Sequence, residues 1–361
     1  MSEYLIGLPE EDAIFLARIA MGFVLCLGAI IGSFLNVCIY RIPLEMSVSK
    51  PRSHCFSCGK TIRWYHNIPV LAWCFLRGKC AYCKAPISFR YPAIEAITAM
   101  LFLMVFQMWG NPALFGLNSL SIPELIPFYW LFVASTVVNI MIDIDHRILL
   151  DRISLGGTLL TLVVSAAFPM IQGELIWYVG LGKAFVGACA GFGVGFAIAF
   201  LGERIFLQDA FGFGDVKWMM LFGALFGWFG LLWIMLMASL LGLLMGVGAL
   251  IYNRVKGLTE EGAVAIPFGP ALGIGALLWL FWGRQVLHAV FTAREWALQH
   301  EEMVLWSVIP LMVGMSIWLL FRIRAIRRYN QALEAEEAES LVPLEELPAA
   351  DDEQTKEGAD A

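Results

Sequence analysis

The sequence has 361 residues, of which 60% are hydrophobic and only 15% charged, with a mean hydropathy of +0.74. Soluble domains carry roughly 25% charged residues, so these values exclude an ordinary soluble enzyme and predict an all-α polytopic membrane protein. The net charge of −6 is uneven, because residues 332–361 hold eleven acids and one base and leave +4 on the remaining chain. We expect this acidic tail to be solvated and disordered.

Apolar segments recur along the chain, and each is about long enough to cross a bilayer core of roughly 30 Å. The first segment runs into charged residues without a small-residue cleavage site, so we interpret it as a retained helix and not as a signal peptide. About eight or nine transmembrane helices are expected, near residues 13–40, 92–109, 124–142, 153–171, 178–201, 218–234, 235–252, 271–289 and 303–321.

The segments 218–234 and 235–252 follow each other without a polar loop. They form either one broken helix or a tight hairpin around Gly227 and Gly230. The even spacing of the basic loops along the chain favours the hairpin.

The basic residues indicate the topology. Residues 41–91 hold nine Lys or Arg and a single acid, and further bases lie on the same side of the predicted bundle. The positive-inside rule places this side in the cytoplasm, with the N-terminus outside and the C-terminal tail inside. Anionic lipid is a sufficient partner for this charge, so nucleic-acid binding is disfavoured.

Four of the eight cysteines form two C-x-x-C pairs within the basic loop, Cys55 with Cys58 and Cys80 with Cys83. This spacing is typical of a four-thiolate zinc ribbon. Redox-active dithiols are the alternative, while structural disulfides do not suit a cytoplasmic loop. A four-cysteine site has no open coordination position, so we expect a structural zinc.

Acidic residues at the ends of apolar helices are expensive to desolvate and therefore indicate function. Asp143 and Asp145 follow the third apolar segment, and on a helix they point about 200° apart. If Asp143 faces the bundle, it could meet Asp215 of the "GFGD" stretch, residues 212–215. Two close carboxylates that share one proton can hydrolyse a peptide bond.

Asp215 also has a plainer interpretation, as the N-cap of the helix that follows it. Gly212 and Gly214 lack side chains beside the acid and would let a substrate backbone approach. The acids Asp145 and Asp151 are most simply parts of a solvated turn. The sequence leaves the choice between cap and catalyst open.

Seven motifs in order over residues 20–290 resemble the bacterial prepilin peptidase family, the type IV leader peptidases. Each motif alone is weak, but their order is specific. They are "GSFLNVCIYRIP" (32–43), the paired C-x-x-C motifs, "NIPVLAW" (67–73), "RYPAIE" (90–95), "MIDIDHRILLD" (141–151), "GFGD" (212–215) and "IPFGP" (266–270).

The resemblance implies a membrane aspartic endopeptidase that cleaves the leader of prepilins and pseudopilins at the cytoplasmic face of the bacterial inner membrane. It implies Asp143 and Asp215 as the catalytic pair. Members with the cysteine loop also N-methylate the new N-terminus with S-adenosylmethionine. Candidates for the methyl-transfer site are Gly32, Ser33, Asn36, Arg41, Arg90 and Glu95. For Glu95 the structural alternative is a salt bridge to Arg41 or Arg90.

The apolar segments and the resemblance together divide the chain into a first helix (1–40), a methyltransferase-associated cysteine loop (41–91), a peptidase core (92–290), an extra helix with a basic collar (291–329) and the acidic tail (330–361). The family does not require the last two parts. The last two could recruit pilus or secretion assembly proteins. One departure is Leu150, where the family usually has proline. Peptidase activity without methyl transfer, and a non-enzymatic transporter or assembly platform, remain the alternative functions.

Overall fold

The computed structural model describes residues 10–110, 123–206, 212–256, 267–299, 313–318, 320–324 and 328. The chain divides into two units. The first combines Met1–Leu201 with Asp209–Val290, and the second combines Gly202–Gln208 with Phe291–Ala361.

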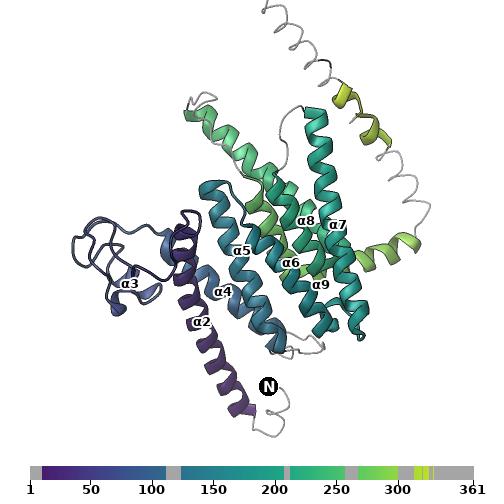
Figure 1. Cartoon of the computed structure of the whole chain (residues 1–361). Helices are drawn as coiled ribbons and strands as arrows, with labels where there is room; N and C mark the ends of the chain where they lie inside the picture. Colours follow the sequence, from purple (N-terminus) through teal and green to yellow (C-terminus); the bar gives the residue numbers. More distant parts are fainter. Residues whose placement is uncertain are drawn as a thin grey trace, which may run out of the picture. The chain divides into compact units, whose positions relative to one another are not determined.

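Long helices make up most of the first unit, and the cysteine loop is its main irregular part (Figure 1). Six helices of the described ranges are long and apolar enough to cross a membrane, which confirms the prediction of an all-α polytopic membrane protein. Each of the first eight expected segments falls mainly within one of seven helices: α2 (Glu10–Arg41), α4 (Arg90–Gly110), α5 (Ile126–His146), α6 (Asp151–Ala167), α7 (Trp177–Phe206), α8 (Phe213–Lys256) and α9 (Gly269–Gln299). The expected segment 153–171 runs past the end of α6 into the turn Pro169–Gln172, and the segment 124–142 begins just before α5.

Helix α8 is two helical arms joined at Gly227, whose φ of 69° and ψ of −179° are not helical. A Cβ atom at Gly273 of α9 would lie 2.7 Å from the Trp218 ring, and one at Gly275 would lie 2.9 Å from the Ile234 carbonyl oxygen. In a straight helix Trp218 and Ile234 would be about 24 Å apart, yet both contact α9 within about 3 Å of its length. The chain therefore reverses at Gly227, as the hairpin interpretation predicts.

Glycines bring α2 and α4 into backbone contact. Cβ atoms at Gly28 and Gly32 would lie 2.7 Å from the Cα atoms of Ala99 and Glu95, closer than real side chains allow. This four-residue spacing of small residues is a common means of close helix packing in membranes, where apolar burial gives little net attraction.

Glycines also allow α7 to pack closely against the first arm of α8. Cβ atoms at Gly187 and Gly191 would overlap the carbonyl oxygens of Gly223 and Met219. The first arm of α8 is thereby held between α7 and the core, and Asp215 in its first turn is fixed in position.

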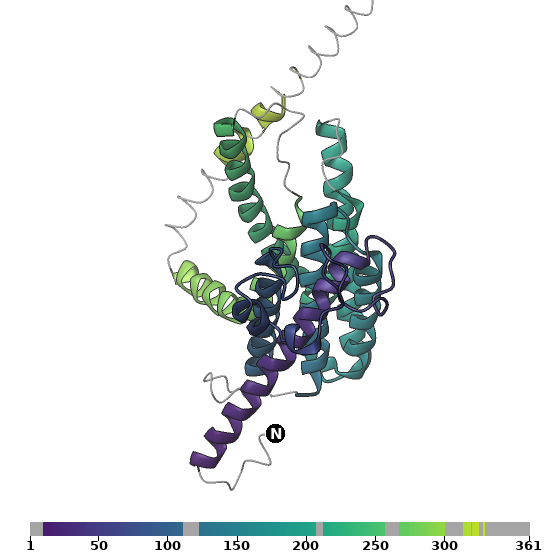
Figure 2. The same ribbon diagram turned by 90° about the vertical axis from the view of Figure 1, so that its left-hand side faces the viewer.

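The cysteine loop connects α2 to α4 in the sequence, contains the short helix α3 (Leu71–Phe75) and lies to one side of α2 (Figures 1 and 2). It forms two matching turns. Gly59 N–H donates to the Cys55 carbonyl at 2.8 Å, and Lys84 N–H donates to the Cys80 carbonyl at 3.1 Å. Gly59 and Lys84 both have positive φ, 68° and 61°. Each C-x-x-C pair is thus one tight turn ending in a left-handed residue.

In the second unit, residues 313–318 and 320–324 are helical. They belong to the expected ninth helix, 303–321, and to the basic collar after it. The rest of that helix and the acidic tail lie outside the described residues.

Candidate active site

Asp143 lies in the last turn of α5 and is only 6% exposed. Its carboxylate accepts a hydrogen bond from the backbone N–H of Gly269, at the start of α9. Asp145, two residues further, points elsewhere: its two oxygens accept hydrogen bonds of 2.7 and 2.6 Å from Arg90 of α4. The expected divergence of the two acids is therefore present, and Asp143 is the one that faces the bundle.

Asp215 is the third residue of α8 and is 9% exposed. Its carboxylate accepts a hydrogen bond from Gly212 N–H, as the third residue does in the capping box of a helix N-terminus. The other oxygen, Oδ1, is buried without a hydrogen-bond partner among the described residues. Asp215 therefore caps its helix with part of its carboxylate and keeps an oxygen available.

The two carboxylates meet at Gly269. A Cβ atom there would overlap Oδ2 of Asp143 and would lie 3.4 Å from Oδ1 of Asp215. The negative charge of Asp143 also acts on Asp215. Two carboxylates so close cannot both be ionised without a large repulsion, so this arrangement favours one shared proton.

The glycines beside Asp215 have separate roles. A Cβ atom at Gly212 would lie 3.3 Å from Oδ2 of Asp215, so its absence leaves room for the carboxylate. At Gly214 a Cβ atom would meet the Leu149 side chain at 3.1 Å. Gly214 therefore lets α8 pack closely on the loop before α6.

The loop that follows α5 gives Leu150 a contact that proline, the usual residue of the family at this position, could not make. Its N–H donates to Oδ1 of Asn139 at 3.3 Å, a hydrogen bond that a proline cannot make. Asp151 is paired with Lys217 at 2.8 Å across α6 and α8. The turn is thus held by its neighbours and leaves Asp143 undisturbed.

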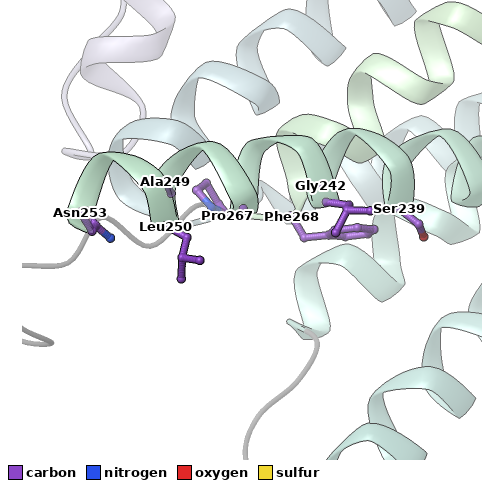
Figure 3. Close-up of a pocket in the computed structure, with 9 residues that line it drawn as sticks. Ser239, Gly242, Ala249, Leu250, Asn253, Pro267 and Phe268 are labelled. Carbon is purple, nitrogen blue, oxygen red and sulfur yellow. The ribbon is translucent and has the colours of Figure 1, made fainter. Parts of the chain in front are cut away.

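A groove lies along the second arm of α8 and reaches the segment before Gly269. It has a volume of about 500 Å³ and is lined by small and apolar residues of the second arm of α8, from Ser239 to Asn253, and by Pro267 and Phe268 (Figure 3). Phe268 immediately precedes Gly269, so the groove begins one residue from the point where the carboxylates meet.

The four predicted metal ligands come together. One sulfur atom from each of Cys55, Cys58, Cys80 and Cys83 lies within 4.8 Å of the others. The Sγ atoms of Cys55 and Cys83 are 3.8 Å apart, and four sulfurs bound at about 2.3 Å to a tetrahedral zinc would also be about 3.8 Å apart. This cluster could therefore hold a metal ion.

Backbone N–H groups favour the thiolate form at this cluster. Hydrogen bonds from Cys58 and Ser57 lower the pKa of Cys55 to about 6. Those from Cys83 and Tyr82 lower the pKa of Cys80, and the Tyr82 N–H lies 3.5 Å from its sulfur. At Cys83 a hydrogen bond from the Ala85 N–H lowers the pKa, but desolvation and contacts with the other thiols outweigh it and raise the pKa to about 11. Metal ligation requires the thiolate, so one cysteine of each turn, Cys55 and Cys80, is prepared for it.

A cavity of about 810 Å³ separates the cysteine loop from α2 and α4. Four of the six candidates for the methyl-transfer site line this cavity: Ser33, Asn36, Arg41 and Glu95. Gly32 lies directly against the backbone of Glu95, whereas Arg90 is not in the wall. The wall also contains aromatic rings and two histidines, namely Phe34, Tyr40, Phe56, Trp73, Tyr82, Tyr91, His54 and His66.

Three residues at these sites are not identified as functional from the sequence. Gly269 lies in the quoted "IPFGP" motif, but nothing in that motif says what the glycine contacts. Asn139 is fully buried, and its position four residues before Asp143 in an apolar segment is a usable signal. His66 faces the cavity, and its Nδ1 is buried without a partner in the part of the chain that the structure describes.

These features define a polytopic membrane protein with a buried carboxylate pair and a separate cysteine-bound module. The Bacterial Peptidase A24 N-terminal domain family matches residues 26–109, and the Type IV leader peptidase family matches residues 128–247. The chain belongs to the type IV leader peptidase family.

Curated relatives cover most of the chain. A prepilin leader peptidase/N-methyltransferase of Myxococcus xanthus is 34% identical over 69% of this chain and 69% of its own length. A type 4 prepilin-like proteins leader peptide-processing enzyme of Escherichia coli is 33% identical over 70% of this chain and 91% of its own length. A prepilin leader peptidase/N-methyltransferase of Pseudomonas putida is 32% identical, over 72% and 90%. No solved structure matches the chain significantly.

Proposed function

We propose that this protein cleaves the leader peptide of type IV prepilins and pseudopilins and then methylates the new N-terminal amine with S-adenosylmethionine. The observation that carries the peptidase half is the approach of Asp143 and Asp215 to Gly269, with one oxygen of Asp215 left unpartnered. Family membership supports the substrate class, and the names of the relatives support methyl transfer.

The proposed hydrolysis uses the shared proton. The ionised carboxylate removes a proton from a water molecule as the water oxygen attacks the scissile carbonyl carbon. The protonated carboxyl of the other aspartate donates its hydrogen bond to the carbonyl oxygen. Collapse of the tetrahedral intermediate then breaks the C–N bond, and the released amine takes up a proton.

Residues 41–91 would hold a structural zinc ion through Cys55, Cys58, Cys80 and Cys83. A closed four-thiolate site supplies no reaction chemistry. Its effect would be to fold the loop that forms one wall of the cavity, so zinc would serve the methyl-transfer site and not the peptidase core of residues 92–290.

S-adenosylmethionine, which supplies the methyl group, would bind in the cavity between this loop and α2 and α4. The wall of the cavity contains the polar side chains of Ser33 and Asn36 and the aromatic rings of Phe56 and Tyr82. Such surfaces suit a charged amino acid linked to a purine ring.

The basic residues support an orientation in the bacterial inner membrane with both sites at the cytoplasmic face. The acids Asp143 and Asp215 lie at helix ends close to these basic residues. A prepilin has a basic leader followed by an apolar helix. The junction between the two would lie at the cytoplasmic face of the membrane, at the depth of the two acids. The C-terminal tail would be available to assembly proteins on the same side.

The test is cleavage of a synthetic prepilin by the full-length protein in membranes. Asp143→Asn and Asp215→Asn should abolish leader release, while Asp145→Asn should retain it because Asp145 serves an ion pair with Arg90. Normal expression and thermal unfolding of each variant are the controls. Cleavage by both of the first two variants would refute the proposed pair. Radiolabelled methyl incorporation by wild type separates a bifunctional enzyme from a peptidase alone.

A further inference from the structure

Glu95 is a buried acid that the peptidase reaction does not use. It lies in the second turn of α4, is 8% exposed, and lines the cavity beside the cysteine loop. The absence of a side chain at Gly32 lets α2 pack directly on its backbone, so its position is fixed by the helix pair.

No cation neutralises Glu95 within the described ranges. Arg41 donates instead to the carbonyl oxygens of Ser47 and Pro51, at 3.0 and 2.8 Å. Arg90 is committed to both oxygens of Asp145. The two salt bridges that the sequence allows are therefore absent, and a carboxylate buried without a counter-ion is costly unless something else compensates its charge.

The carboxylate is instead held by neutral donors. Val70 N–H donates to its Oε2 at 2.7 Å, and the Ser33 side chain forms a second hydrogen bond. These contacts fix the direction of the carboxylate at the cavity wall but bring no positive charge. The site is thus prepared for a cation that comes from outside the chain.

The Val70 donor is positioned by a strained turn. Val70 has φ of 60° and ψ of −53°, values that a β-branched residue rarely adopts. Leu71 N–H donates to the Pro69 carbonyl at 2.5 Å, which closes a three-residue γ-turn of the rare positive-φ kind. Strain of this type persists where a site requires it, and here it directs an N–H group at Glu95.

The cation is identified by what the neighbouring site produces. Peptide cleavage at Asp143 and Asp215 creates a new α-ammonium group. The same helix that carries Glu95 is tied by Arg90 to Asp145, two residues beyond Asp143. The carboxylate pair and Glu95 thus lie on neighbouring helices, and the new ammonium group is the cation that the proposed cleavage would supply.

We propose that Glu95 binds the α-ammonium group of the processed substrate in this cavity, which rests on the proposed methyl-transfer function. The carboxylate takes one proton from the ammonium group and becomes a carboxylic acid. The nitrogen is then left with a free lone pair, which is the form that accepts a methyl group.

The experiment measures binding and does not depend on methyl transfer. The probe is a synthetic peptide of the processed substrate's N-terminal apolar helix, labelled at its C-terminus. It is prepared with a free N-terminal amine and with an acetylated one. Full-length protein in lipid nanodiscs is titrated with each peptide, and the dissociation constants are obtained from fluorescence anisotropy.

Wild type should bind the free amine about tenfold more tightly than the acetylated peptide, as expected for a charged hydrogen bond. Glu95→Gln should bind both peptides equally, with unchanged affinity for the acetylated one, which also reports correct folding. Glu174→Gln is the matched control, because this acid lies in the loop before α7, pairs with Lys183 of α7 and does not line the cavity. It should keep the wild-type preference.

If Glu95→Gln retains the preference, or if wild type has none, the assignment of Glu95 is overturned. If Glu95→Gln fails to bind the acetylated peptide, the variant is misfolded, and Glu95→Asp is tested in its place. That variant keeps the charge but withdraws it from the cavity, and an undiminished preference would likewise refute the proposal. Methyl incorporation by wild type, measured in parallel, reports separately on the proposed function.

Discussion

Gly269→Ala tests the placement of the two aspartates without changing either one. The added Cβ would overlap Oδ2 of Asp143, and ordinary contact begins only at 3.4 Å. The carboxylate would have to move by about 1 Å, a displacement that typically costs about 100-fold in rate, or about 2.7 kcal/mol in the barrier. We expect leader release to fall by this factor while the protein remains folded.

The assay is the initial rate of leader release from a synthetic prepilin in proteoliposomes, with thermal unfolding measured on the same preparations. Gly193→Ala in α7 is the control, since a Cβ atom there would have nothing within 4 Å. It should cleave normally and gain up to about 1 kcal/mol in helix stability. A Gly269→Ala enzyme that cleaves within about threefold of wild type, a barrier change under about 1 kcal/mol, would refute the proposed geometry.

Three further outcomes follow from the same structure. Cys55→Ser, or treatment with a chelator, should remove bound zinc, measured by metal analysis, and abolish methyl transfer while leader release continues. Gly191→Ala should destabilise the protein by about 1–3 kcal/mol in thermal unfolding, because its Cβ would overlap the Met219 carbonyl and force α7 and α8 apart. Leu150→Pro should change stability by no more than about 1 kcal/mol and leave cleavage intact, since its φ of −76° suits proline and only the 3.3 Å bond to Asn139 is lost.

Much of this arrangement could be predicted because its physical causes are local. Apolar segment length predicts the helices, and the reversal at Gly227 follows from two apolar arms without a polar loop. The spacing of Cys55, Cys58, Cys80 and Cys83 predicts a compact cluster, which the structure contains. Asp143 and Asp215 stand out because an acid at the end of an apolar segment is costly to desolvate.

The remaining features depend on contacts between distant segments. The sequence offers Arg41 and Arg90 equally as partners of Glu95, and only the fold shows that both are bound elsewhere. Val70 is a poor residue for a positive φ, so its turn has no local signal. Gly269 has no side chain to suggest a role, although it is the point where both carboxylates meet.

The Asp215 carboxylate caps its helix and also serves the proposed reaction, and these two roles place opposite demands on the residue. An asparagine at this position would still accept the hydrogen bond from Gly212, would remove the repulsion from Asp143, and could donate to it. Under the proposed mechanism the asparagine variant would be inactive, yet it would be more stable than the wild type. Repeated selection for heat resistance alone would be expected to erase this acid, so its persistence in a thermally adapted descendant would be direct evidence that the reaction was still needed.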